Sequence, residues 1–260
     1  MKLMPILAVI LAAASIAAAE LRIADATGHG DIPVRQLALR QALSDPSGPV
    51  KYERSGKAEA LAGLAGGRFD LVIMDVPAIP ADFKGTRKVY GVRALAFYVN
   101  VANTLEGAKS DQLRDIFTDK KPRWQDYSFL AADIKRYGIR PGKPGAELMA
   151  DFLLRGSKLA EETTLLKSTP EIVLMTGADP AAIGFGVYLS SAPVQVKMLA
   201  VDGVAPTLKS VREATYPLAV KRAVLAAKIP GETARKFLAE MEKADFRDLV
   251  KDAGMEPVEK

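Results

Sequence analysis

The first third of the chain alternates short apolar runs with amphipathic stretches. The runs at 21–24, 50–54 and 69–75 have the length and residue types of strands. Between them, 33–38 and 57–64 carry apolar residues at helical spacing, and Asp31 and Pro33 stand where a helix cap and a first-turn proline are expected. The order strand, helix, strand, helix, strand predicts a parallel α/β sheet.

The rest of the chain continues the mixture of strands and helices. A Pro-, Lys- and Gly-containing loop is expected over 78–91, and Ser110 is expected to cap a short helix. Trp124 is expected to pack under a basic loop. The apolar run 172–175 fits either a helix segment or a strand. The remaining pattern predicts strands at 92–100, 135–139, 180–188, 194–201 and 216–225, helices at 111–117 and 144–154, and two amphipathic helices at the C-terminus.

Residues 1–19 read as a secretory signal peptide. Lys2 precedes the uncharged apolar run Leu3 to Ile16, and Ala17 to Ala19 supply small residues at the cleavage positions. The alternative is an uncleaved anchor, but the run is short for a membrane span. We expect cleavage after Ala19 and export to the periplasm.

Composition narrows the chemistry. The 260 residues carry a formal net charge of +5, spread along the chain without a basic stripe, which argues against nucleic-acid binding. The chain has no Cys and one His, so thiolate chemistry is excluded and zinc sites built from His and Cys nearly so. No nucleophile motif or metal motif is visible, and we expect neither an enzyme nor a cofactor.

Three loops are candidate ligand contacts. The stretch 140–147 joins Arg140 and a glycine-bearing loop to a helix start, a combination that suits an anion, although a plain surface connector fits as well. Thr27 lies in a loop at the carboxyl end of the first strand, where open α/β sheets bind ligands, and His29 follows as either a surface residue or a contact. Asp75 ends a buried strand, either as a site residue or as a turn residue before Pro77.

Several of these segments resemble one family in order and spacing. The matching pieces are Phe69–Pro77, Val92–Asn100, Asp115-Ile116-Phe117 with Trp124, Arg140 with its loop, Pro180–Tyr188 and Tyr216-Pro217-Leu218. Together they cover most of 20–225, and the chain resembles the periplasmic phosphate-binding proteins of Pst-type ABC importers, within the type II periplasmic-binding-protein superfamily.

The resemblance implies two α/β lobes joined by two crossing strands, Val92–Asn100 and Tyr216–Val220, with the ligand in the cleft. Lobe one would be 20–98 plus 205–260, and lobe two 99–204. It further implies that a dehydrated phosphate is held by an Arg, an Asp, loop hydroxyls and backbone N–H groups. Carried over by position, the ligand contacts are Thr27, Gly28, Ser55, Asp75, Arg140, Gly145 and Ala146.

The chain departs from the family at one loop. Pro144-Gly145-Ala146 stands where the family has Ser-Gly-Thr, so two hydroxyls are missing and Pro144 has no N–H. A buried anion loses roughly 1.5–3 kcal/mol for each missing charge-assisted hydrogen bond. Glu147 stands close by and would either repel an anion or cap its own helix.

Two functions remain open from the sequence. The first is a monomeric solute-binding protein for a small oxyanion, phosphate first, that delivers its ligand to an inner-membrane ABC permease. The second is a binding-protein-like envelope module that has lost phosphate binding and acts through protein contacts or another ligand.

Overall fold

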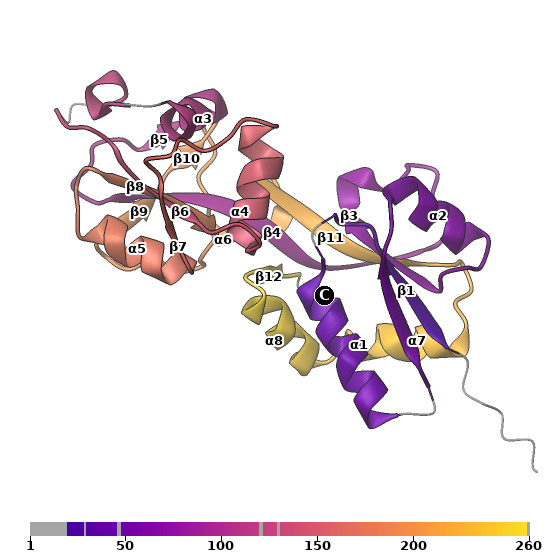
Figure 1. Cartoon of the computed structure of the whole chain (residues 1–260). Helices are drawn as coiled ribbons and strands as arrows, with labels where there is room; N and C mark the ends of the chain where they lie inside the picture. Colours follow the sequence, from indigo (N-terminus) through magenta and orange to yellow (C-terminus); the bar gives the residue numbers. More distant parts are fainter. Residues whose placement is uncertain (1–19, 29, 46–47, 120–121, 129–130, 259–260) are drawn as a thin grey trace, which may run out of the picture.

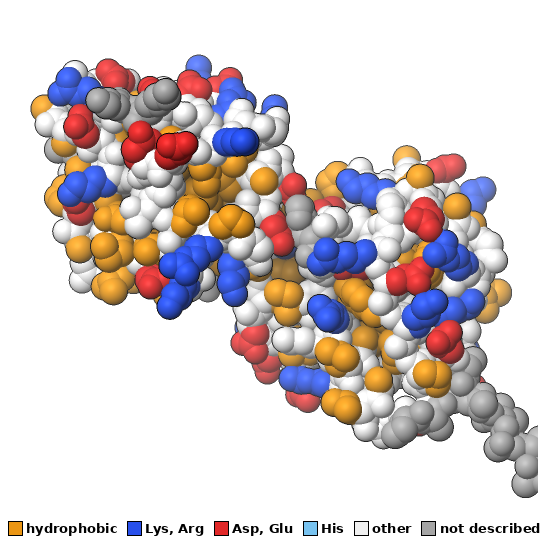
Figure 2. All heavy atoms as spheres, in the orientation of Figure 1, with side chains coloured by type: hydrophobic (Ala, Val, Ile, Leu, Met, Phe, Trp, Pro, Cys, Tyr) orange, Lys and Arg blue, Asp and Glu red, His pale blue; other side chains and the backbone are white. Residues whose placement is uncertain are grey.

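The fold is that of two lobes joined by a narrow waist (Figures 1 and 2). The computed structural model describes residues 20–28, 30–45, 48–119, 122–128 and 131–258. The strands β4 (Thr86–Asn100) and β11 (Ala219–Ala226) run through the waist as an antiparallel pair. The predicted signal peptide and His29 lie outside the described residues.

The first lobe is built on the predicted parallel strands. The sheet order is β2 (Val50–Arg54), β1 (Leu21–Asp25), β3 (Leu71–Asp75) and then β11, which runs antiparallel to β3. The helices α1 (Ile32–Ser44) and α2 (Lys57–Ala65) connect these strands, as the periodicity predicts. Because successive side chains point to opposite faces, the sheet buries one apolar cluster on each face.

The prediction of a loop over 78–91 is wrong for residues 86–91, which form a strand. A short 3₁₀ turn, η1 (Val76–Ala78), follows β3, and β4 then begins at Thr86. Arg87 and Lys88 give this part of the strand a polar sequence because it is only half buried, and Lys88 forms an ion pair with Glu242 at 2.7 Å. Pairing with β11 in fact holds the segment in the sheet.

The second lobe continues the sheet from β4. Its order is β4, β8 (Ala182–Val187), β6 (Lys135–Ile139) and β7 (Thr164–Leu166), with β9 (Val196–Met198) also paired to β4. Three rings pack at its centre, with the Phe117 and Phe185 centroids 5.1 Å apart beside Phe97. Trp124 is buried, as expected, in the 3₁₀ turn η2 (Trp124–Asp126), while Lys120 and Lys121 of the basic loop lie outside the described residues.

The helices of the second lobe differ in type and bounds from those predicted from the sequence. The ambiguous run 172–175 is helical, within α5 (Thr169–Gly177). The helix from Pro144 is regular only as α4 (Pro144–Met149) and continues as a π-helical turn, η3 (Ala150–Leu154). The expected cap at Ser110 is wrong: α3 (Ser110–Thr118) begins at this residue, and its hydroxyl donates to Asp202 Oδ2 at 2.5 Å.

Two expected strands start or end differently. The run 194–201 is broken into β9 and β10 (Ala200–Val201), which pairs with β5 (Gly107–Ala108). The strand expected from Tyr216 begins only at Ala219, because a turn precedes it. The remaining elements are α6 (Leu208–Glu213), α7 (Glu232–Glu240), α8 (Ala244–Asp252) and β12 (Glu256–Pro257).

The cores separate on either side of the waist. One apolar cluster contains residues from Val92 to Leu218, and the two clusters of the other lobe contain residues before 91 and after 222. The sequence-based boundaries at 98/99 and 204/205 stay predictions. Within the described part of the chain, no helix has the length and apolar character needed to cross a membrane.

Candidate functional site

A cavity of about 190 Å³ lies at the waist and is lined by both lobes. The first lobe contributes the start of α1 and the end of β2, and the second lobe contributes the start of α4. The crossing strands contribute two arginines. The lining residues are Gly30, Asp31, Ile32, Pro33, Arg35, Tyr52, Arg54, Arg93, Gly142, Pro144, Glu147, Leu148, Val187, Arg222, Ala253, Gly254 and Met255.

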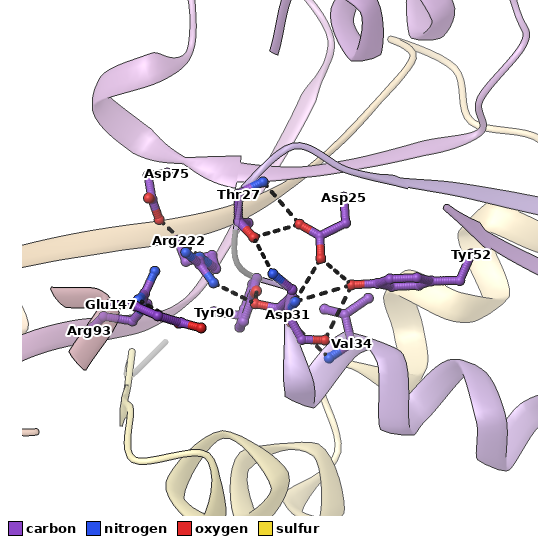
Figure 3. A network of polar contacts seen from close by, with 11 residues as sticks. Asp25, Thr27, Asp31, Val34, Tyr52, Asp75, Tyr90, Arg93, Glu147 and Arg222 are labelled. Atoms are coloured by element: carbon purple, nitrogen blue, oxygen red, sulfur yellow. Dashed lines mark hydrogen bonds and ion pairs between the residues drawn. The ribbon is translucent and has the colours of Figure 1, made fainter. Parts of the chain in front are cut away.

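Arg222, on β11, is held by two carboxylates. Its Nε donates to Asp75 Oδ1 at 2.9 Å and its Nη1 to Asp31 Oδ2 at 3.2 Å (Figure 3). Burial opposes its charge, but the negative charges of Asp31 and Asp75 raise the pKa of Arg222 above its ordinary value. Its Nη2 is buried and has no hydrogen-bond partner among the described residues.

Arg93, on β4, has fewer partners. Its side chain is 5% exposed, and its Nη2 lies 3.6 Å from Glu147 Oε2, which is an ion pair beyond hydrogen-bonding distance. Neither Nη1 nor Nη2 has a hydrogen-bond partner among the described residues. Burial, and next the charge of Arg222, lower the pKa of Arg93. An anion between the two guanidinium groups would relieve this repulsion and supply the missing bonds.

The carboxylate of Asp31 lies at the N-terminus of α1, where an anionic ligand could otherwise bind. As the sequence predicts, it caps the helix: its Oδ1 accepts the N–H of Val34 at 3.0 Å. Its Oδ2 accepts the hydroxyl of Tyr90 and the Nη1 of Arg222 (Figure 3). The positive end of α1 is therefore already paired with an internal anion.

Asp25 organises the loop that precedes α1. Its Oδ1 accepts the N–H and the hydroxyl of Thr27 at 2.9 and 2.6 Å, and its Oδ2 accepts the N–H of Asp31 at 2.7 Å and the hydroxyl of Tyr52 at 2.6 Å (Figure 3). Burial works against the carboxylate, but these donors hold the pKa of Asp25 below its ordinary value. The loop thus wraps around an internal carboxylate.

None of the seven residues carried over from the resemblance lines the cavity. In the first lobe, Thr27 is buried with its donors on Asp25, and Gly28 is exposed with a φ of 84°. The hydroxyl of Ser55 donates to the carbonyl of Gly56 at 3.4 Å. Asp75 approaches the cavity only through its ion pair with Arg222. As ligand contacts, these four residues stay predictions.

The three residues from the second lobe have other neighbours. Arg140 is exposed, and its Nε donates to the carbonyl of Leu165 at 3.3 Å. Gly145 packs closely in the lobe, since a Cβ there would lie 2.9 Å from Ile139 Cγ1. The N–H of Ala146 is bonded to the carbonyl of Lys143 at 3.0 Å. As ligand contacts, these residues also stay predictions.

Sequence reasoning missed the two arginines that do line the cavity. The signal is present: Arg93 interrupts the apolar run from Val92 to Val99, and Arg222 precedes the apolar run from Ala223 to Ala226. A charge within a buried strand is costly unless it is paired, so it marks either an ion pair or a ligand site. Among the described residues, no cluster of His, Cys, Asp and Glu side chains could hold a metal ion.

Two α/β lobes, an antiparallel strand pair that crosses between them and a cavity at the crossing define the fold of a type II periplasmic binding protein. The comparisons with solved structures agree. The chain is similar to a possible phosphate-binding protein from Planctomyces limnophilus DSM 3776, with a TM-score of 0.79 at 14% identity over 93% of this chain and 94% of the other.

Two further solved structures align over nearly all of their own length. PstS from Borrelia burgdorferi aligns with a TM-score of 0.67 at 17% identity, covering 93% of this chain and 99% of that one. An ABC-type phosphate transport receptor from Vibrio cholerae aligns with a TM-score of 0.65 at 16% identity, covering 92% and 100%. At these identities the likeness shows the fold alone. No protein-family model and no curated protein sequence matches the chain.

Proposed function

We propose that this protein is a periplasmic solute-binding protein for a small oxyanion, with phosphate as the first candidate, and that it serves an ABC importer. One observation carries the proposal. Arg93 and Arg222 are buried at the cavity between the lobes and together present three guanidinium nitrogens without hydrogen-bond partners among the described residues. Leaving a buried donor unpaired costs about 1–3 kcal/mol, and more for a charged group, so these nitrogens favour an anionic ligand.

The geometry supports capture by lobe closure. The cavity is bounded by α1 from one lobe and α4 from the other, while both arginines belong to the crossing strands. A ligand held by the arginines would be enclosed as the lobes rotate about the waist, and the closed form would be delivered to an inner-membrane permease. The protein would act as a monomer without catalysis.

The test compares two arginine variants by isothermal titration with inorganic phosphate. Arg93→Met keeps most of the buried volume and removes the charge, and it should weaken binding about 10- to 100-fold, the loss of one charge-assisted hydrogen bond. Arg140→Ala, at an exposed residue outside the cavity lining, is the matched control and should bind as the wild type does.

Two results would contradict this assignment of the site. Unchanged phosphate affinity in Arg93→Met, with the wild-type melting temperature, would remove Arg93 from the site. Loss of binding in Arg140→Ala would place the ligand at the loop implied by the family resemblance.

A second candidate function also has an observation in its favour. The donors of Thr27, which would hold an anion in the family, are bonded to Asp25, and Glu147 faces Arg93. A module that no longer binds phosphate and works through protein contacts fits this internal pairing. Titrations of wild-type protein with phosphate, sulfate and arsenate that release no heat and give no thermal stabilisation would favour this second function.

A further inference from the structure

The buried cations of the cavity are already matched by carboxylates. Arg93 and Arg222 are its buried cations. Asp31 and Asp75 both pair with Arg222, and Glu147 pairs with Arg93. Asp31 and Glu147 line the cavity together with the two arginines, and Asp75 contacts Arg222 from outside the lining, so the inner cavity has no net positive charge before a ligand binds. A simple dianion would bring two negative charges that nothing in the inner cavity compensates, so the charge balance favours a ligand that also carries a positive charge.

The two arginines at the mouth of the cavity compensate a charge in the inner cavity only weakly. Arg35 and Arg54 also line the cavity, but both side chains are exposed to solvent. Water and salt screen exposed charges strongly, whereas buried pairs are screened much less. Arg35 and Arg54 are therefore suited to attracting an anion to the cavity, and the inner groups decide which ligand fits.

Glu147 is the carboxylate best placed to meet a positive group. It lies in the first turn of α4, its side chain is 21% exposed, and it lines the cavity. Its contact with Arg93 is 3.6 Å, longer than a hydrogen bond, so its oxygens keep capacity to accept from a ligand. Asp31, by contrast, already accepts from Val34, Tyr90 and Arg222.

The cavity has room for more than a bare tetrahedral anion. Its volume is about 190 Å³. A protein cavity of roughly 150 Å³ holds a six-carbon ring, while pockets for drug-sized molecules begin near about 300 Å³. A tetrahedral oxyanion with a short substituent therefore suits the cavity better than a bare oxyanion or a drug-sized molecule.

We propose that the ligand is a zwitterionic phosphorus oxyanion, an aminoalkyl phosphate or phosphonate, whose oxyanion binds Arg93 and Arg222 and whose ammonium group faces Glu147. The proposal rests on the proposed function and adds the substrate class. Glu147 is then the specificity-determining residue: it favours the amine-bearing ligand and disfavours an uncharged substituent.

The experiment uses two probes that differ in one group. O-phosphoethanolamine carries an ammonium where propyl phosphate carries a methyl group of similar size, and inorganic phosphate is the third probe. Affinities are measured by isothermal titration for the wild type, for Glu147→Gln, and for Glu106→Gln as a control. Glu106 is an exposed glutamate of the same lobe that pairs with Lys197, and it does not line the cavity.

We expect the wild type and Glu106→Gln to bind O-phosphoethanolamine at least about tenfold more tightly than propyl phosphate, as for a close charge pair in a partly buried site. In Glu147→Gln the ratio should fall to about one, with propyl phosphate bound as tightly as before or more tightly. Because propyl phosphate reports the oxyanion site by itself, it shows whether the variant is folded and binding.

The outcomes separate this inference from the proposed function. Equal affinities for the two probes in the wild type, or a preference that survives in Glu147→Gln, would overturn the role of Glu147 while the oxyanion site stands. Failure of all three probes to bind the wild type would overturn the proposed function and this inference with it.

Discussion

Tyr52→Phe tests the internal carboxylate around which the first loop is built. The substitution removes one hydroxyl that donates to Asp25 Oδ2 at 2.6 Å and leaves the ring in place. A hydrogen bond to a charged group contributes about 1.5–3 kcal/mol to stability. For a chain of this length, 1 kcal/mol shifts the melting temperature by about 2–4 °C, so Tyr52→Phe should melt about 3–12 °C lower at pH 7.

The matched control removes a similar hydroxyl from a neutral acceptor. Tyr98 donates to the carbonyl of Val187 at 2.7 Å, so Tyr98→Phe should cost about 0.5–1.5 kcal/mol. Chemical denaturation followed by circular dichroism gives the free energy of unfolding of each variant. The larger loss should belong to Tyr52→Phe, because its acceptor is ionised.

The stability loss caused by Tyr52→Phe should depend on pH through the ionisation of Asp25. The pKa of Asp25 lies below its ordinary value, although burial opposes this, because Thr27, Tyr52 and Asp31 donate to the carboxylate. Such a group stabilises the fold above its unfolded pKa of about 3.9, and the contribution is lost as the pH falls through the folded pKa. The cost of Tyr52→Phe should therefore shrink below about pH 4, whereas that of Tyr98→Phe should not. Equal and pH-independent costs would refute the reasoning.

Two further substitutions test packing and charge. Gly145→Ala should destabilise the protein by about 1–3 kcal/mol, because its Cβ would lie 2.9 Å from Ile139 Cγ1. Gly231→Ala, with no atom within 4 Å of its Cβ, should cost less, about 0.5 kcal/mol for the weaker N-cap of α7. The free energies of unfolding decide, and equal costs would contradict close packing of α4. Asp75→Asn should strengthen phosphate binding by about 1 kcal/mol in isothermal titration, since it removes one negative charge beside Arg222. Weaker phosphate binding, together with lost discrimination against sulfate, would instead make Asp75 a direct ligand contact.

Most of the first lobe could be predicted from its sequence because each signal there is local. The alternation of strand 50–54, the helical spacing after Asp31 and the apolar run before Asp75 each depend on neighbours within a few residues. The start of β4 could not be predicted in this way, because its polar residues are held in the sheet by a strand more than 120 residues later.

The cavity was harder to predict than the fold for the same reason. Arg222 lies beside Asp31 and Asp75 only because β11 is inserted next to β3, and Arg93 meets Glu147 only because α4 lies against the waist. Position along the chain points to loops at strand ends, where ligands often bind. It does not reveal that the donors of one such loop are already used by Asp25.

The two arginines couple the cavity to the arrangement of the lobes. Both belong to the crossing strands, while Asp31 belongs to the first lobe and Glu147 to the second. A rotation that moves either lobe relative to its crossing strand would lengthen or shorten the ion pair on that side. A ligand that bridges the arginines and Glu147 therefore favours one lobe arrangement over others in proportion to the contacts it gains there. In the proposed function, the same guanidinium nitrogens that lack hydrogen-bond partners in the protein would then also set how far the cleft closes.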